Sequence, residues 1–233
     1  MNLYHIKMHI KRNKLIKRVY DALFKAKRNE QEEQRKCAAL AADGMSMVAD
    51  IEEILAKTPY TYFLTYGNLL GLVREGHFLA HDNDLDYAIC MDETLSWEGL
   101  ENYLAEGGFV KCRQFLIDGE IQEQSYRRGE LTVDFFGYKS SETETVSHCF
   151  FRKDDYIYND RYDMHIREEH FAPIKSVHRV EYNGVLMTVP TDPVPYLESV
   201  YGPGWRVPDP TWTDDMGDNR IIMDKLGRLD PCK

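Results

Sequence analysis

The sequence lacks several features that would place it in familiar classes of protein. No apolar run reaches the roughly 18 to 20 residues that a membrane-spanning helix needs. The N-terminal segment has neither the unbroken apolar block nor the small-residue cleavage site of a signal peptide. The five cysteines are odd in number, scattered and without a C-x-x-C pair, which argues against a disulfide framework. We therefore expect a cytoplasmic protein.

Common catalytic motifs are also missing. The chain has no G-x-S-x-G segment and no Ser/His/Asp or Cys/His nucleophile signature. The segment HIREEH, residues 165–170, contains His165, Glu169 and His170, but its spacing is not that of H-E-x-x-H. Ordinary surface or core histidines are the favoured interpretation. These absences argue against serine or cysteine hydrolases and against zinc peptidases.

Charge is unevenly distributed along the 233 residues, whose formal net charge is −10. Residues 1–28 hold nine Lys or Arg against a single acid, Asp21, a net charge of +8 that leaves −18 for the rest. Because the body is acidic, we expect no nucleic-acid partner. The basic segment has apolar residues at spacings near three and four, which predicts an amphipathic helix. Peripheral contact with an anionic inner-membrane surface, docking on the acidic body or a partner, and a merely solvated basic face remain open.

The order of predicted elements indicates an α+β fold, a mixed sheet flanked by helices with an N-terminal helical arm. We expect a helical region over 1–57 and a second domain over 58–233. Predicted helices cover 3–29, 30–55, a glycine-flanked stretch after residue 67, 95–105, and a short segment from Asp192-Pro193. Predicted strands cover 62–66, 85–91, 109–117, 121–128, 131–138 and 146–151, with a hairpin turn at Asn183-Gly184. The tail from Pro203 onward is predicted to be irregular but packed.

Three aspartates, Asp82, Asp84 and Asp86, are spaced two residues apart immediately before the apolar run YAIC. Side chains two apart on a strand share a face, so these carboxylates would repel one another unless a cation lay between them. A further acid, Asp134, lies inside the predicted strand TVDFF. If the two strands are neighbours, Asp84, Asp86 and Asp134 can converge as hard oxygen ligands for Mg²⁺ or Mn²⁺. The alternative is that the acids are solvated turn residues.

The residues before the acidic cluster suit phosphate binding. Gly67 is predicted to lie where a strand gives way to a helix, so that backbone N–H groups there can bind a phosphate. Asn68 adds an amide donor, and Arg74 adds a planar guanidinium. The alternative for Gly67 is a role in the turn and in packing. The alternative for Arg74 is an ion pair with Glu75 or an aspartate.

The stretch YGNLLGLVREGHFLAHDNDLDYAI resembles the signature of the LicD/fukutin family: a glycine-polar-Leu-Leu-Gly segment, an Arg and a D-x-D-h-D cluster. TVDFFGY is similar to the family's Val-Asp-aromatic strand, and VPTDPVPYLESVYGPGW to its closing segment. The resemblance covers roughly residues 60–208, with the matches in the family's order. Asn68 departs from the family's usual Thr or Ser, and His81 stands where bacterial members usually have Trp.

The resemblance implies a nucleotidyltransferase-like fold in the second domain and a specific activity. Family members move phosphocholine, ribitol phosphate or glycerol phosphate from CDP-linked donors onto glycans, some of them lipid-linked. By position, Asp84, Asp86 and Asp134 resemble the metal ligands, Gly67 with Asn68 the phosphate-binding turn, and Arg74 its basic partner. Asp82 matches the first acid and is the candidate base, or a group that orients a ligand or water. Nucleotidyl transfer from an NTP, or an inactive scaffold that binds glycan or nucleotide, are the alternative functions.

Overall fold

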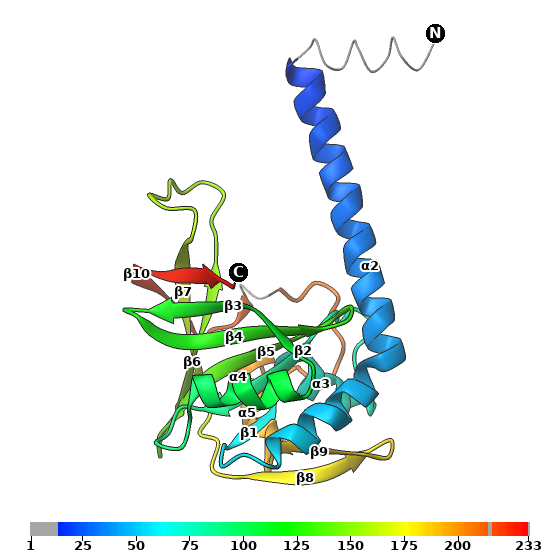
Figure 1. The fold of residues 1–233 in the computed structure, drawn as a ribbon, viewed down its shortest axis with the longest axis vertical. Coiled ribbons are helices and arrows are strands. Elements are labelled where there is room, and N and C mark those ends of the chain that lie inside the picture. The colour runs from blue at the N-terminus through cyan, green and yellow to red at the C-terminus, as the bar shows by residue number, and fades with distance from the viewer. Residues whose placement is uncertain (1–13, 214–215, 233) are drawn as a thin grey trace.

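A computed structural model describes residues 14–213 and 216–232 of the chain, with side chains described from residue 26. These residues form an α+β fold (Figure 1). The helices are α2 (Lys14–Leu55), α3 (Tyr66–Glu75), α4 (Trp97–Glu106) and α5 (Pro193–Tyr201). The strands are β1 (Tyr62–Leu64), β2 (Leu85–Cys90), β3 (Val110–Ile117), β4 (Glu120–Arg128), β5 (Leu131–Ser140), β6 (Thr145–Phe151), β7 (Asp163–Phe171), β8 (Val177–Tyr182), β9 (Val185–Pro190) and β10 (Arg220–Pro231).

Eight strands form one sheet in the order β1-β2-β5-β4-β3-β10-β7-β6. Strand β6 also pairs with β5, so the sheet closes on itself and leaves β1 and β2 as an extension from β5. The β2–β5 pair is parallel, whereas the other pairings of the described strands are antiparallel. Strands β8 and β9 form a separate hairpin.

The two faces of β2 and β5 pack in two hydrophobic clusters. Tyr87 and Ile89 of β2 join Phe135 of β5 in a cluster with the second half of α2 and with α4. Because side chains alternate along a strand, Ala88 and Phe136 point the opposite way, into a cluster with α3 and α5. Asp84, Asp86 and Ala88 therefore lie on the α3 side of the sheet.

Helix α2 shares the core of the sheet from Leu40 onward, so the boundary predicted at residue 57 lies between two parts of one hydrophobic cluster. Glu52 anchors the helix, since its buried carboxylate accepts hydrogen bonds from the Thr188 backbone N (2.8 Å) and hydroxyl (2.8 Å) and from the Tyr62 hydroxyl (3.2 Å). Burial raises the pKa of Glu52 despite these donors. The N-terminal half of α2 extends away from the body (Figure 1).

Several predicted elements are confirmed, including the strands that carry the aspartates, the short helix from Pro193 and the Asn183-Gly184 hairpin. At that turn both residues have positive φ, 50° and 82°, the backbone conformation that Asn-Gly adopts readily. None of the described helices is long and apolar enough to cross a membrane.

Three predictions about these elements are wrong. The helices predicted over 3–29 and 30–55 are one continuous helix from Lys14, because residues 24–36 are mostly good helix formers and include no Gly or Pro. Residues 3–13 of that prediction lie outside the described residues. Tyr66 begins α3 and does not end a strand. The tail is not irregular throughout, since β10 inserts between β3 and β7.

Candidate metal centre

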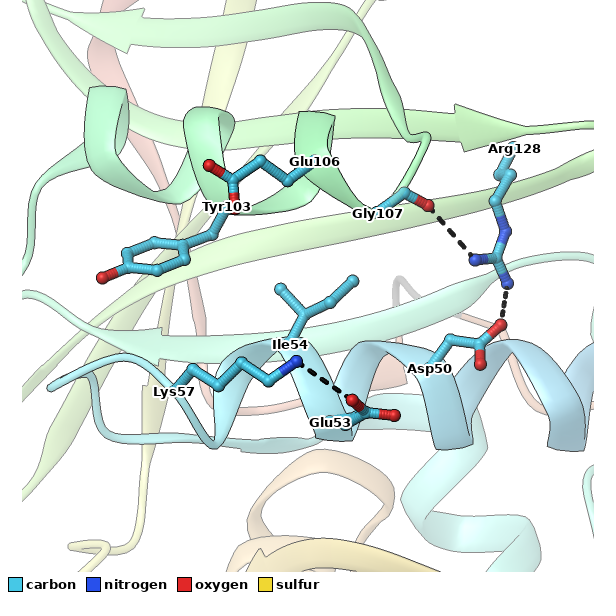
Figure 2. A pocket seen from close by; sticks show the side chains of 8 residues that line it. All are labelled: Asp50, Glu53, Ile54, Lys57, Tyr103, Glu106, Gly107 and Arg128. Atoms are coloured by element: carbon cyan, nitrogen blue, oxygen red, sulfur yellow. Dashed lines mark hydrogen bonds and ion pairs between the residues drawn. The ribbon is translucent and has the colours of Figure 1, made fainter.

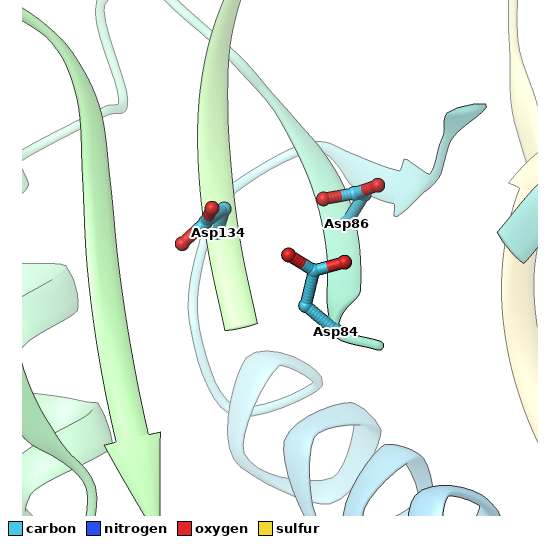
Figure 3. A group of neighbouring side chains, drawn as sticks. All are labelled: Asp84, Asp86 and Asp134. Carbon is cyan, nitrogen blue, oxygen red and sulfur yellow. The ribbon is translucent and has the colours of Figure 1, made fainter. Parts of the chain in front are cut away.

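Asp84, Asp86 and Asp134 meet at the start of the β2–β5 pair. The parallel register places Asp86 beside Asp134, and Asp84 lies two residues earlier on the same face of the chain. One carboxylate oxygen from each residue lies within 4.8 Å of the others. Figure 3 shows the three side chains grouped at the two neighbouring strands. The geometric condition that the sequence analysis set for a shared cation is met.

Asn68 holds the backbone that carries these acids. Its side-chain Oδ1 accepts a hydrogen bond from the Asp86 backbone N (2.6 Å). Its Nδ2 donates to the Asp84 backbone O (3.2 Å) and to Asp82 Oδ2 (3.3 Å). Asn68 is buried in the first turn of α3. Asn68 therefore stabilises the backbone around Asp82, Asp84 and Asp86. Direct contact between Asn68 and a phosphate stays a prediction.

Gly67 and Asp82 are packed against each other. A Cβ atom on Gly67 would lie 2.9 Å from Asp82 Oδ1, so any other residue would displace that carboxylate. Asp82 Oδ2 also accepts from the Leu79 backbone N (3.3 Å). Burial raises the pKa of Asp82. Asp82 lies beside the cluster, and its observed contacts order the loop, whereas its role as a base stays a prediction.

The three converging carboxyl groups resist ionisation. Burial, followed by repulsion from Asp134, raises the pKa of Asp84 to about 6. Burial and the other two aspartates raise the pKa of Asp86 well above its ordinary value. Burial also raises the pKa of Asp134, which Arg113 partly offsets. Because Asp134 Oδ1 is buried and has no hydrogen-bond partner, this set of hard oxygen donors fits a divalent cation.

Two basic residues beside the cluster were not predicted from the sequence. Arg113 of β3 donates from Nε to Ser125 Oγ (2.9 Å), and its Nη2 lies 3.5 Å from Asp134 Oδ2. Its side chain is 49% exposed, so the guanidinium remains accessible to a ligand. Lys36 of α2 lowers the pKa values of Asp84 and Asp134 through its charge. Arg113 pairs with Ser125, and Ser125 in turn pairs with Asp134. The register of the three strands predicted within 109–138 could therefore have placed Arg113 near Asp134.

A further acid near the cluster is Glu123, buried in β4. Burial and then the charge of Asp134 raise its pKa well above the ordinary value. Glu123 lies two residues from Ser125 on the same strand, so alternation gives both side chains the same face. No motif in the sequence marked this residue.

Arg74 makes the ion pair that was kept open as its alternative role. Its Nε and Nη2 donate to Glu75 Oε1, at 3.0 and 2.7 Å. Its Nη1 donates to the backbone O of Trp205 (3.2 Å). These contacts tie the end of α3 to the C-terminal segment, and a role for Arg74 in phosphate binding stays a prediction.

The histidines of 165–170 do not come together. The segment lies on strand β7, where residues five apart point to opposite faces. His165 is buried beside the Tyr158 hydroxyl (2.6 Å), whereas His170 contacts Glu144 (2.9 Å). This placement agrees with ordinary core and surface histidines.

A groove of about 410 Å³ lies between the C-terminal end of α2 and α4 (Figure 2). None of its lining residues belongs to the acidic cluster. The cations in its wall are paired there, Lys57 with Glu53 and Arg128 with Asp50. The groove offers no comparable set of ligating atoms.

The stability of the protein should report on the buried charges. Since the pKa of Asp84 rises from 3.8 to about 6 on folding, its contribution favours the folded state below about pH 4 and is lost as pH rises through about 6. In metal-free protein at pH 7.5, Asp84→Asn should raise Tm by about 2–6 °C, and Mn²⁺ should raise the Tm of wild type but not of the variant. Thermal unfolding measures both, and Asp43→Asn, at an exposed residue of α2, is the control. An unchanged Tm together with a retained Mn²⁺ response would contradict this electrostatic account.

The match to a known protein family covers the same residues. The chain matches the family LicD/FKTN/FKRP, nucleotidyltransferase domain, over residues 59–192. Comparison with individual curated proteins finds no match. The matched region is more than half of the chain and contains Gly67, Asn68 and the three converging aspartates. The chain belongs to the LicD/FKTN/FKRP family, a family of transferases.

Proposed function

We propose that the protein transfers a phospho-alcohol, such as phosphocholine, glycerol phosphate or ribitol phosphate, from a CDP-linked donor to a hydroxyl of a glycan. The observation that carries the proposal is the convergence of Asp84, Asp86 and Asp134 in a member of this family. Phosphoryl transfer needs positioning and charge neutralisation more than covalent chemistry from the protein. Such a cluster on a nucleotidyltransferase-like fold provides both.

Asp84, Asp86 and Asp134 would hold Mg²⁺ or Mn²⁺. The bound cation would neutralise charge on the donor diphosphate as the transition state forms. The unpaired Oδ1 of Asp134 is the donor atom with the most to gain from a cation, since it is buried without any other partner.

The bond changes are those of a direct displacement. A glycan hydroxyl oxygen attacks the phosphorus that bears the alcohol, a new P–O bond forms, and the P–O bond to CMP breaks. CMP leaves with the bridging oxygen, and the hydroxyl proton passes to a base. Asp82 remains the candidate, because burial raises its pKa and so improves it as an acceptor near neutral pH. Its hydrogen bonds to Asn68 and Leu79 support loop orientation as its second role.

Arg113 is placed to bind the donor's phosphate oxygens. Its Nη2 reaches Asp134 only at 3.5 Å, and the guanidinium is half exposed. Its Nε is fixed by Ser125, so the group is already oriented before a ligand arrives. A planar guanidinium suits bidentate contact with phosphate. Arg113 is therefore a second candidate for the basic group, beside Arg74, whose guanidinium contacts Glu75 and the Trp205 carbonyl.

The reaction can be distinguished from its alternatives by its products. Incubation with CDP-choline, CDP-glycerol or CDP-ribitol, Mg²⁺ and a candidate glycan should release CMP, and EDTA should prevent release. Alanine at Asp84, Asp86 or Asp134 should abolish transfer and leave the fold intact, because losing one carboxylate relieves repulsion. Chromatography of the nucleotide products, with circular dichroism of each variant, provides the measurement.

Other products would favour other functions. Pyrophosphate release from an NTP would support nucleotidyl transfer, for which the family's nucleotidyltransferase domain is the specific observation. Donor binding without turnover in any combination would support a scaffold. Wild-type transfer by Asp84→Ala would overturn the proposed assignment of the site.

Replacing Arg113 should weaken donor binding more than it slows chemistry. We expect Arg113→Met to raise KM for the donor about 10-fold or more, since a charge-assisted hydrogen bond contributes about 1.5–3 kcal/mol. Steady-state CMP release measures the effect, and Arg228→Met, an exposed arginine of β10 paired with Asp160, is the control. An unchanged donor KM would remove Arg113 from the binding site.

The N-terminal part of α2 suits an anionic membrane surface. Residues 26–32 are all exposed, and the N-terminal end of the helix extends away from the body (Figure 1). The basic charge of residues 1–28 complements anionic lipid headgroups. We propose peripheral contact at the inner membrane surface of a cytoplasmic enzyme, where a lipid-linked glycan acceptor would be within reach.

Vesicle sedimentation tests this contact on the full-length chain. Substituting Glu for Lys14, Lys17 and Arg18 together should lower partitioning onto phosphatidylserine-containing vesicles about 10-fold or more. The matched control places Glu at Lys57, Lys139 and Lys175, exposed lysines of the body. Equal partitioning of the two triple variants would remove the membrane proposal.

A further inference from the structure

Tyr66, the first residue of α3, has an unusual backbone conformation. Its φ is +46°, a backbone conformation that non-glycine L-residues rarely adopt. The other described non-glycine residues with positive φ, Asp118 and Asn183, lie in two-residue hairpin turns, where such angles are common. Tyr66 instead lies between a strand and a helix, directly before Gly67. A strained residue in such a place persists only where its surroundings hold it.

Residues of two strands, β5 and β7, hold the side chain of Tyr66. Its hydroxyl donates to Glu169 Oε2 of β7 (2.8 Å). Its ring packs edge-on against Phe136 of β5 and Phe171 of β7, with centroids 5.2 and 6.2 Å away. Glu169 is fully buried, so the position of its carboxylate depends on its own partners.

Two arginines fix the other oxygen of Glu169. Arg167 Nε and Arg220 Nε donate to Oε1, at 2.9 and 3.0 Å. The Arg220 side chain is only 7% exposed and comes from β10, about 150 residues after Tyr66 in the chain. A buried carboxylate with two guanidinium partners is a rigid acceptor, because neither oxygen can turn away without stranding a charge.

The backbone that Tyr66 fixes leads directly into the acidic site. Gly67 follows it and packs against Asp82, and Asn68 then binds the Asp84 and Asp86 backbone. The backbone N of the preceding residue, Thr65, donates a hydrogen bond to the Asp86 carbonyl (3.0 Å). Any shift of the turn at Tyr66 would therefore move Thr65 and Asn68, the two residues that bind the backbone of the aspartates.

We propose that Tyr66, tethered by Glu169 and Arg220, is a positioning residue that holds the first turn of α3 in the conformation that keeps Asp84 and Asp86 in ligating geometry. The consequence of this tether for catalysis rests on the proposed function, whereas the effect of the tether on the turn does not.

Amide hydrogen exchange in metal-free protein tests the tether. Two amides report on the turn, that of Leu69, which bonds to the Thr65 carbonyl, and that of Asp86, which bonds to Asn68. Tyr66→Phe removes only the hydroxyl, and we expect exchange at both amides to accelerate about 10-fold or more. Arg220→Lys, which retains charge but loses the Nε donor, should accelerate the same amides less.

A matched control separates this effect from general destabilisation. Tyr62→Phe also removes a tyrosine hydroxyl bonded to a buried glutamate, Glu52, on the α2 side of the sheet. It should leave the two reporter amides unchanged after correction for global stability. Wild-type exchange in Tyr66→Phe and Arg220→Lys, or equal acceleration in Tyr62→Phe, overturns the tether.

Titration with Mn²⁺, followed by calorimetry, measures metal affinity, which would not change if Tyr66 had only a structural role. Tyr66→Phe should bind Mn²⁺ about 10-fold more weakly than wild type or Tyr62→Phe. Faster exchange with unchanged Mn²⁺ affinity would overturn the positioning role. If wild type itself binds no Mn²⁺, the metal-dependent function fails, while the exchange result still decides the tether.

Discussion

The parallel pairing of β2 with β5 is the interaction on which the candidate site depends. It brings Asp86 and Asp134 side by side and places Asp84 against both. Burial of these carboxylates costs free energy, and their mutual repulsion adds to that cost, as their raised pKa values show. Hydrophobic clusters on both faces of the two strands offset that cost. The sheet thus holds charges together that would separate in water.

The turn beside these strands is built from distant parts of the chain. Thr65 is bonded to the hydroxyls of Tyr138 and Tyr196, and Tyr66 to Glu169. Tyr196 lies beyond the region that matches the family and belongs to α5. The closing segment therefore supports the site through the turn of α3, without contributing a ligand to the cluster.

Charge near the cluster is arranged differently from charge over the whole molecule. The body is strongly acidic, yet Arg113 and Lys36 both act on the aspartates, from β3 and α2. A phosphate-bearing donor of the proposed kind would meet the positive charges of Arg113 and Lys36 there. Helix α2 consequently belongs to the site as well as to the extended N-terminal segment: Cys37 Sγ contacts the His81 carbonyl (3.5 Å), and Asn83 donates to Glu33.

Local sequence determined the aspartate-bearing strands, the Asn183-Gly184 hairpin and the short helix at Pro193, because alternation, turn chemistry and capping act over a few residues. Those patterns, together with the family resemblance, selected three acids that meet in space. The insertion of β10, the tether at Tyr66 and the place of Arg113 were decided only by tertiary structure. Each depends on which distant strands pair, and pairing follows packing and burial across the whole sheet more than the preference of any one segment.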